Sequence, residues 1–409
     1  LNPKMTSKQF KGILQQIEEI SHKMSKIGGY ASLSYSSDTQ SDEATSLMTQ
    51  MSKLGSEISN KILFFDLWWK TQVDEKNAKR LMKDTGELKE YLAYKRLFAK
   101  YALSESEEKI INILDVTGIS ALVKLYDKIT NVYEYKMKIG NRTKTMTREE
   151  LTNYVRSTNP KIRETAYKTI LTKYTENKGV IGEIYQNIVL NWKDEGIELR
   201  GYKSPISMRN IANDVDDKTI ESLLSICRKN STVFQKFFLQ KAKMLNMKKL
   251  QRYDLYAPAA SKIKEKNYSY NQSVKLVFES LGKFSSTLEE HARKVFNENH
   301  IDSAIRQGKR DGAFCSTLSP KITPYVLVNF TGKSRDVFTL AHELGHAVHS
   351  QAAQDRSILV QDAPLPLAET ASTFSELLLY DNLADKISDD QKKIMLAEKI
   401  DDLYATILR

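Results

Sequence analysis

Residues 339–350 read TLAHELGHAVHS, and this stretch holds three of the six histidines of the chain. His342, Glu343 and His346 form the pattern H-E-x-x-H. In a helix, residues four apart project from the same face, so both imidazoles can bind one metal ion. Glu343 flanks that face, where its carboxylate can accept a proton from a water molecule on the metal. The stretch therefore predicts a metal-binding helix with Glu343 as general base.

The residues around this motif favour a helix. Apolar residues recur there at helical spacing, namely Val337, Leu340, Ala341, Leu344 and Val348. Ser334 is the predicted N-cap, and no proline follows before Pro364. Gly345 costs about 1 kcal/mol relative to alanine inside a helix. That cost is easier to explain if a strand or a substrate approaches this face closely.

A third protein ligand is needed, because catalytic zinc usually has three. The extended motif with a third histidine is excluded, since position 352 is alanine. The segment PLPLAETASTFSELLLY, residues 364–380, predicts a second helix that begins at its two prolines. Glu369 and Glu376 fall on one face of it, and Glu369 is the predicted ligand. Glu376 either orients a ligand histidine or is solvated, and His349 either supports a ligand, contacts substrate or is an ordinary helix position.

These motifs together resemble the oligoendopeptidase F branch of the thimet oligopeptidase family of zinc metallopeptidases. LAHELGHAVHS matches the zinc helix, PLPLAETAS matches the segment of the third ligand, and GKRDGAFCSTLSPKITPYVLVNFTG matches the strand region before the helix. Similar stretches further upstream are YASLSYSSDT at 30–39, RGYKSP at 200–205 and YDLYAP at 253–258. The likeness therefore covers most of the chain.

The resemblance implies a mainly α, two-lobed metallopeptidase with a deep channel and a small β element beside the H-E-x-x-H helix. It implies one Zn²⁺ per chain, held by His342, His346 and Glu369. It also implies an endopeptidase that hydrolyses internal bonds of short unstructured oligopeptides. A helical zinc carboxypeptidase is an alternative enzyme, and a peptide-binding protein that keeps zinc without turnover is an alternative outside the enzymes.

The strand region offers candidate substrate contacts. Residues 325–330, YVLVNF, alternate with a period of two and predict a short strand. As an edge strand it can pair with substrate main chain, and the other interpretation is a strand buried only for packing. Gly312, Ala313 and Phe314 precede it as further candidates. Gly312 is either a turn glycine or a site of close backbone approach.

Members of the oligoendopeptidase F branch continue beyond a segment that resembles IDDLYATILR, which is residues 400–409 of this chain. Their continuation carries tyrosines and a histidine that hold the substrate and stabilise the oxyanion, and no residue of this sequence matches those groups. Three expectations follow for the missing C-terminal segment: the chain is a fragment, a separate chain supplies the segment, or part of the site has been lost.

Composition sets wider limits on the fold. The 409 residues are 28% charged and 41% hydrophobic, which is ordinary for a globular protein with a large core. Few prolines and glycines, together with helix-period stretches at 47–89, 147–199 and 219–245, predict a mainly α protein. We expect an N-terminal helical region at 1–195 and a zinc peptidase catalytic region at 196–409.

Smaller features complete the expectations. The polar stretch 34–44 predicts a loop, and DLWWK at 66–70 predicts a buried aromatic cluster.

The two cysteines, Cys227 and Cys315, argue against a disulfide framework and favour a reducing cytoplasm. The net charge of +11 is spread along the chain without a nucleic-acid motif. We expect a cytoplasmic protein that binds short peptides, and neither nucleic acid nor a membrane.

Overall fold

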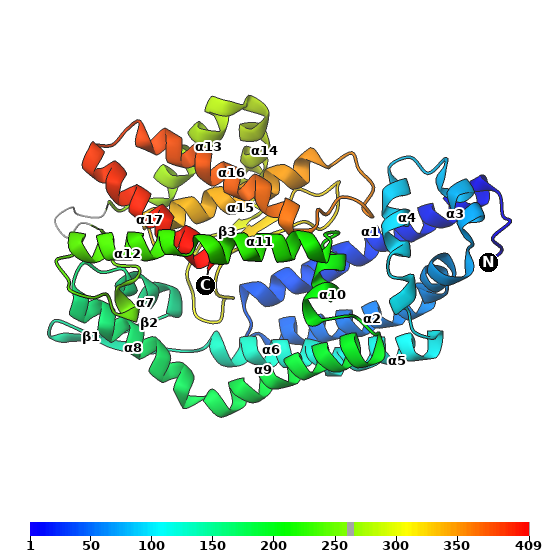
Figure 1. Ribbon diagram of the computed structural model, residues 1–409, viewed down its shortest axis with the longest axis horizontal. Helices are drawn as coiled ribbons and strands as arrows, with labels where there is room; N and C mark the ends of the chain where they lie inside the picture. The colour runs from blue at the N-terminus through cyan, green and yellow to red at the C-terminus, as the bar shows by residue number, and fades with distance from the viewer. Residues whose placement is uncertain (260–265, 409) are drawn as a thin grey trace.

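Helices make up most of the chain in the computed structural model, which describes residues 1–259 and 266–408 (Figure 1). The predicted mainly α fold class is confirmed. Residues 260–265 and 409, which fall inside the predicted catalytic region, lie outside the described residues. The α-helices of the described part are α1 (Ser7–Ser37), α2 (Asp42–Leu67), α3 (Glu75–Met82), α4 (Leu88–Arg96), α5 (Glu105–Thr117), α6 (Ile119–Thr130), α7 (Arg148–Val155), α8 (Pro160–Glu176), α9 (Lys178–Lys193), α10 (Pro205–Ala212), α11 (Asp217–Asn230), α12 (Thr232–Met244), α13 (Tyr270–Phe284), α14 (Ser286–Asn297), α15 (Ser334–Ala352), α16 (Leu365–Ala384) and α17 (Asp389–Ile407).

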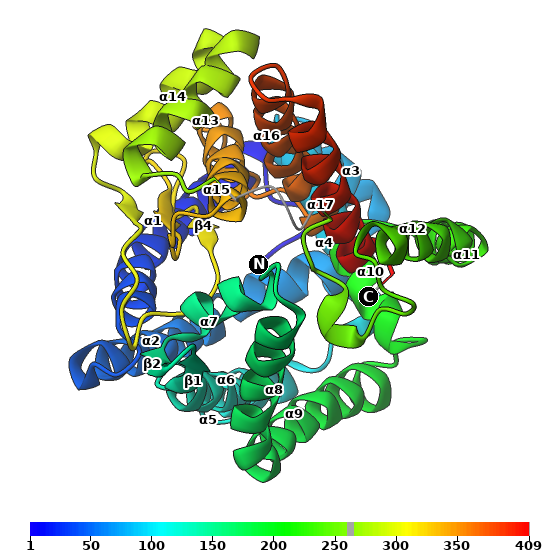
Figure 2. The ribbon, with the colours of Figure 1, turned by 90° about the vertical axis from the view of Figure 1, so that its left-hand side faces the viewer.

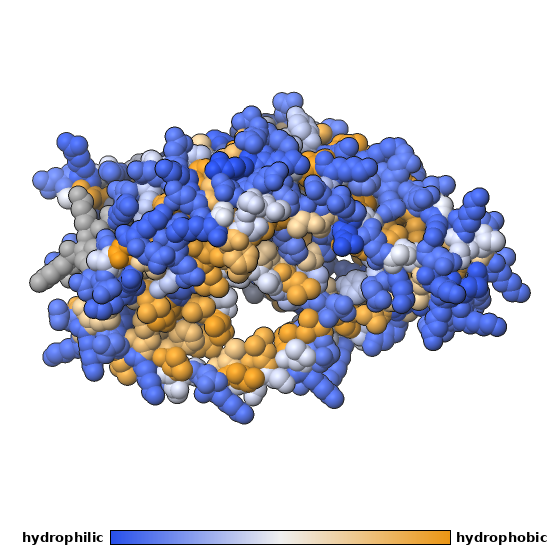
Figure 3. All heavy atoms as spheres, turned by 90° about the horizontal axis from the view of Figure 1, so that it is seen from above, coloured by the Kyte–Doolittle hydropathy of each residue, from blue (hydrophilic) through white to orange (hydrophobic). Residues whose placement is uncertain are grey.

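Helices from both halves of the chain are arranged around a common centre when the molecule is viewed along its long direction (Figure 2). Seen from above, the space-filling view shows an opening through the molecule whose rim carries many apolar side chains (Figure 3). Large apolar residues are exposed on α5, α9 and α11, for example Ile113, Tyr185 and Leu223. This opening is consistent with the deep channel that the family resemblance implies.

The strands form two small sheets. Strands β1 (Tyr135–Ile139) and β2 (Arg142–Met146) pair as an antiparallel hairpin. Strands β3 (Ile301–Asp302), β4 (Phe314–Ser316) and β5 (Tyr325–Leu327) form a second sheet in the order β3-β5-β4. The expected β element therefore exists beside the metal helix, but the prediction that residues 325–330 form an edge strand is wrong. β5 ends at Leu327 and is paired on both sides, so it has no free edge for a substrate. In this three-stranded sheet β3 and β4 are the edge strands, and β4 is the one that follows Gly312.

The structure divides each of the three helix-period stretches into more than one helix. The stretch 47–89 is interrupted by a π-helical turn over Trp68–Gln72, after which Asp74 caps a new helix by accepting the Asn77 N–H at 3.0 Å. The stretch 147–199 contains several helices, and Pro160 fixes the first turn of α8. Caps and prolines end a helix without changing the spacing of its apolar residues. Apolar spacing alone therefore did not show where one helix ends and the next begins.

The prediction of a loop at 34–44 is also wrong, because both ends of this stretch are helical. Helix α1 continues to Ser37, and α2 begins at Asp42. Ser41 accepts the Ala44 N–H at 3.2 Å and so acts as the N-cap of α2. The polar residues here start and end helices, and only residues 38–41 connect them.

The aromatic cluster in DLWWK is confirmed as core. Trp68 and Trp69 retain 3% and 1% of their accessible surface. The Trp69 indole N–H donates to the carbonyl oxygen of Leu92 at 2.9 Å, which joins α4 to this cluster. The aromatic cluster therefore stabilises the fold by packing among the N-terminal helices.

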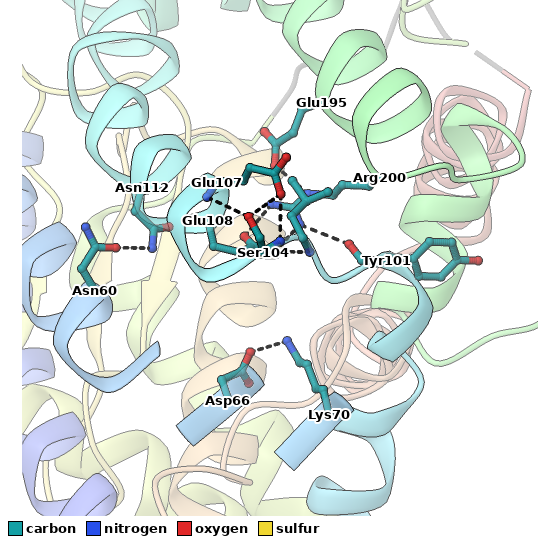
Figure 4. Close-up of polar contacts among 11 residues, drawn as sticks. Asn60, Asp66, Lys70, Tyr101, Ser104, Glu107, Glu108, Asn112, Glu195 and Arg200 are labelled. Atoms are coloured by element: carbon teal, nitrogen blue, oxygen red, sulfur yellow. Dashed lines mark hydrogen bonds and ion pairs between the residues drawn. The ribbon is translucent and has the colours of Figure 1, made fainter. Parts of the chain in front are cut away.

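Each of the three upstream motifs contacts a segment that is distant in the sequence. Arg200 of RGYKSP donates to Glu108 of α5 at 2.7 Å and to Glu195 at 2.9 Å (Figure 4). Asp254 of YDLYAP accepts from the buried Arg163 of α8 at 2.6 Å. Thr39, from YASLSYSSDT, donates its backbone N–H to the Gly308 carbonyl at 2.8 Å. These contacts therefore join parts of the chain that are far apart in the sequence.

Candidate metal centre

Helix α15 carries both histidines and Glu343. It begins at Ser334, with Lys333 at the N-cap position, so the prediction of Ser334 as N-cap is wrong by one residue. The start of helix α15 is held by Asp336, whose carboxylate accepts hydrogen bonds from the backbone N–H groups of Thr331 at 2.7 Å and Lys333 at 3.1 Å. A first-turn carboxylate is favourable there, because it meets the unpaired N–H groups and the positive end of the helix dipole.

The close neighbour of Gly345 is helix α16. A Cβ added to Gly345 would lie 2.6 Å from the Ala371 carbonyl oxygen and 2.7 Å from the Ser372 Cα. The expectation that a strand or a substrate approaches this position is therefore wrong. Only glycine lets the two helices come this close, and the approach brings Glu369 of α16 to the histidines of α15.

His342, His346 and Glu369 converge at one point, as the spacing predicted. Their ligand atoms all lie within 4.8 Å of one another. Oε2 of Glu369 is 3.2 Å from Nε2 of His342 and 3.6 Å from Nε2 of His346. Ligand atoms about 2.0 to 2.1 Å from a tetrahedral zinc ion are about 3.3 Å apart. The donor set and its spacing therefore fit a zinc ion with an open fourth position.

Neighbouring side chains orient these ligands. Nδ1 of His342 donates to Oε1 of Glu376 at 2.7 Å, which leaves Nε2 as the metal-facing nitrogen. Of the two interpretations of Glu376, the geometry supports the orienting one. The hydroxyl of Ser372 donates to Oε2 of Glu369 at 2.8 Å. Burial opposes the charged form of His342, but the hydrogen bond to Glu376 and the nearby carboxylates outweigh it and raise its pKa.

Glu343 faces the protein interior beside the histidines. Only 6% of its surface is exposed. Burial raises the pKa of Glu343 to about 7, although the neighbouring His342 acts to lower it. Cys315 of β4 lies nearby, where burial and the charge of Glu343 raise the pKa of its thiol. A carboxyl group with a pKa near neutrality suits proton transfer at neutral pH.

The remaining predicted residues lie around this group. His349 is half-buried one turn beyond His346. Burial and then the neighbouring His342 lower the pKa of His346, Glu369 opposes them, and His349 adds a smaller lowering. Gly312 has φ +80°, and the Asn329 side chain donates to its carbonyl at 2.9 Å. No described atom lies within 4 Å of a Cβ built there, so the positive φ, and not a close neighbour in the described chain, favours glycine at this position.

Ala313 and Phe314 lead from this turn into the edge strand β4. The strand runs beside α15, because Cys315 is near Glu343 and Thr317 is 2.5 Å from Ser350 between their hydroxyl oxygens. Strand β4 therefore runs along the helix that carries His342 and His346, and among the described strands its outer edge is unpaired.

Two supporting residues were missed from the sequence. Ser372 lies three residues after Glu369 inside AETAS, so helical spacing was a usable signal for it. Lys399 is different, since its Nζ lies 2.5 Å from Oε2 of Glu376 although it belongs to another helix, α17. No local pattern indicates such a contact.

A large cavity opens beside the centre. Its volume is about 1060 Å³, and it lies between α7, the start of α15 and α17. Glu376 and Lys399 are part of its lining, with Phe338 and Tyr380 among the apolar walls. The cavity meets the centre at Glu376, which accepts the hydrogen bond of His342, whereas His342, His346 and Glu369 are not part of its lining.

Residues 153–409 match the model of peptidase family M3. This chain belongs to that family. Among curated relatives, the M3 chain is 27% identical over 98% of its length to an oligoendopeptidase F homolog of Borreliella burgdorferi. It is 25% identical over 97% of its length to the chromosomal oligoendopeptidase F of Lactococcus lactis. The predicted resemblance to the oligoendopeptidase F branch is confirmed.

The M3 chain covers 68% of the Borreliella relative and 66% of the Lactococcus one, so it spans about two thirds of their length. Solved structures share its fold. PZ peptidase A, determined with an inhibitor, has a TM-score of 0.79 at 16% identity, over 92% of this chain and 65% of that one. Oligoendopeptidase F from Enterococcus faecium has a TM-score of 0.67 at 17% identity, over 98% of this chain and 67% of that one.

The M3 chain also has two free cysteines, Cys227 and Cys315. None of its described helices is both long enough and apolar enough to cross a membrane.

Proposed function

We propose that this chain carries the zinc centre of an endopeptidase that hydrolyses internal bonds of short, unstructured peptides. The observation that carries the proposal is the group formed by His342, His346 and Glu369 with the buried Glu343 beside it. Three protein donors and an open position are the usual arrangement of catalytic zinc. The names of the related proteins support a peptidase that acts on oligopeptides.

Each protein group has a distinct role in this mechanism. A zinc ion at the centre would act as a Lewis acid toward the scissile carbonyl and would acidify a water molecule. Glu343 accepts a proton from the attacking water and later passes it to the amine that leaves. Glu376 keeps the Nδ1 proton on His342, so that Nε2 remains free as a donor atom.

The substrate would bind as an extended chain along β4. Its outer edge is unpaired among the described strands, and it leads away from the turn at Gly312. Main-chain hydrogen bonds to such an edge give affinity without requiring a particular sequence. The adjacent cavity of about 1060 Å³ would hold peptide side chains on one side of the cleaved bond. A folded protein lacks a free extended segment and would be spared.

A peptide library tests this proposal. The purified chain is incubated with mixed peptides of 5 to 15 residues, with zinc or with a chelator, and the products are identified by mass spectrometry. We expect internal cleavage that the chelator abolishes and that Glu343→Gln abolishes while retaining zinc. Release of single C-terminal residues alone would indicate a carboxypeptidase. Peptide binding without any products, in the presence of zinc, would indicate a binding protein.

Two further expectations remain proposals. The boundary between an N-terminal helical region and the catalytic region is placed at residue 196, whereas the family match begins at residue 153. A cytoplasmic location is proposed from cysteine use, because both thiols are free.

A further inference from the structure

A third helix reaches the metal centre through one side chain. Nζ of Lys399, on α17, lies 2.5 Å from Oε2 of Glu376. The other carboxylate oxygen, Oε1, accepts the Nδ1–H of His342 at 2.7 Å. The side chains of Lys399 and Glu376 are only 24% and 19% exposed, so water screens this pair less than a surface ion pair. The contacts form a chain from Lys399 through Glu376 to His342.

Both oxygens of Glu376 are therefore held at the same time. A carboxylate fixed at one oxygen can still rotate about its last bond, whereas one fixed at both oxygens presents a single direction to its partners. That direction decides where the His342 ring points, because its Nδ1–H follows the acceptor. The charge of Lys399 also balances the carboxylate in a site with little water.

Helix α17 is also joined to helix α12 by a buried ion pair. Asp401, two residues after Lys399, forms a buried ion pair with Lys241 of α12. Residues two apart point to nearly opposite sides of a helix. One side of α17 is thus fastened to α12 while the other side supports the metal centre.

We propose that Lys399 is a positioning residue of the metal centre, which fixes the Glu376 carboxylate so that Nε2 of His342 is aimed at the metal ion. The inference rests on the proposed metal site and goes beyond its ligands. It assigns no contact between Lys399 and the ion, the water or the substrate. Outer-shell partners of this kind are commonly worth about tenfold to a hundredfold in metal affinity.

The test measures zinc affinity by competition with a chromophoric chelator. Lys399→Met keeps the length of the side chain and removes its charge and donors, so we expect zinc to bind about tenfold more weakly. Lys399→Arg keeps a cation that can reach Glu376 and should restore most of the affinity. The matched control is Lys393→Met on the same helix, since Lys393 is 71% exposed and forms an ion pair with the equally exposed Asp390 of α17. That variant should bind zinc like the unaltered chain.

A double variant separates positioning from a general loss of structure. Once Glu376→Gln has removed the carboxylate, adding Lys399→Met should change zinc affinity by less than about twofold. If Lys399→Met weakens binding equally in both backgrounds, it acts through the stability of the fold and the inference is wrong. Unchanged affinity in Lys399→Met alone also overturns it. Failure of the unaltered chain to bind zinc would instead refute the proposed metal site itself.

Discussion

Gly345 and Ala371 set the distance between the two helices of the metal centre. A Cβ at Gly345 would stand 2.6 Å from the carbonyl oxygen of Ala371, a separation that real Cβ atoms essentially never show. Ala371 lies two residues after Glu369 on the first turns of α16. The same contact that requires glycine in α15 therefore determines how near the third ligand comes to the histidines.

Gly345→Ala should for this reason damage both stability and metal binding. The new methyl group meets backbone, which cannot move aside as a flexible side chain would, so α16 must shift. We expect a loss of about 1 to 3 kcal/mol in the free energy of unfolding, measured by denaturant titration, and weaker zinc binding. Gly12→Ala is the control, because nothing lies within 4 Å of its Cβ and a helix interior favours alanine. If both variants behave alike, the close approach does not limit the site.

Glu369→Ala should lose zinc. Removing one of three protein ligands leaves two histidines, which cannot hold the ion firmly without the carboxylate. Elemental analysis after dialysis should show about one zinc per unaltered chain and far less in the variant. The control is Asp381→Ala, which removes an exposed carboxylate from the same helix. Full zinc content in Glu369→Ala would direct attention to Glu376 as the ligand.

Glu343→Gln should change the pH dependence of stability in the zinc-free chain. Burial raises the pKa of Glu343 from 4.5 to about 7, so the folded state holds its proton more tightly than the unfolded state. Below about pH 4.5 the carboxyl is protonated in both states. Between about pH 4.5 and 7 the unfolded state releases the proton while the folded state keeps it, so the free energy of unfolding falls across this window and is level above it. The amide does not titrate and avoids this loss, which is of the order of 3 kcal/mol at pH 8.

The measurement is thermal unfolding with a chelator present. We expect Glu343→Gln to be more stable than the unaltered chain at pH 8 and to lose this advantage by pH 5. The exposed Glu290→Gln should show no such difference. An advantage that grows as the pH falls would contradict the raised pKa.

Arg163→Met should strongly destabilise the chain. Its guanidinium and the Asp254 carboxylate are 2.6 Å apart, with side chains that are 1% and 0% exposed. Removing one partner leaves a buried charge without compensation, which commonly costs about 3 to 5 kcal/mol. Lys168→Met, in the same helix, breaks an exposed pair with Glu164 and should cost less than about 0.5 kcal/mol. Denaturant titration of both variants gives the comparison, and equal small losses would show that the Arg163 pair is dispensable.

The sequence by itself determined the local features of the site. An H-E-x-x-H pattern on a helix fixes which two imidazoles share a face, because helical geometry is the same in every protein. The same geometry placed Glu369 and Glu376 on one face of the next helix. It also predicted the mainly α fold, since apolar period and scarce proline act locally.

Tertiary structure decided everything that joins distant segments. The pairing order placed β5 in the centre of its sheet and left β4 at the edge, and no property of residues 325–330 alone distinguishes these positions. The neighbour of Gly345 is a helix from 26 residues further along the chain, counted from 345 to 371. Lys399 reaches Glu376 only because α17 packs beside α16 and is fastened to α12. Such contacts depend on the packing of whole helices, which sequence periodicity describes one helix at a time.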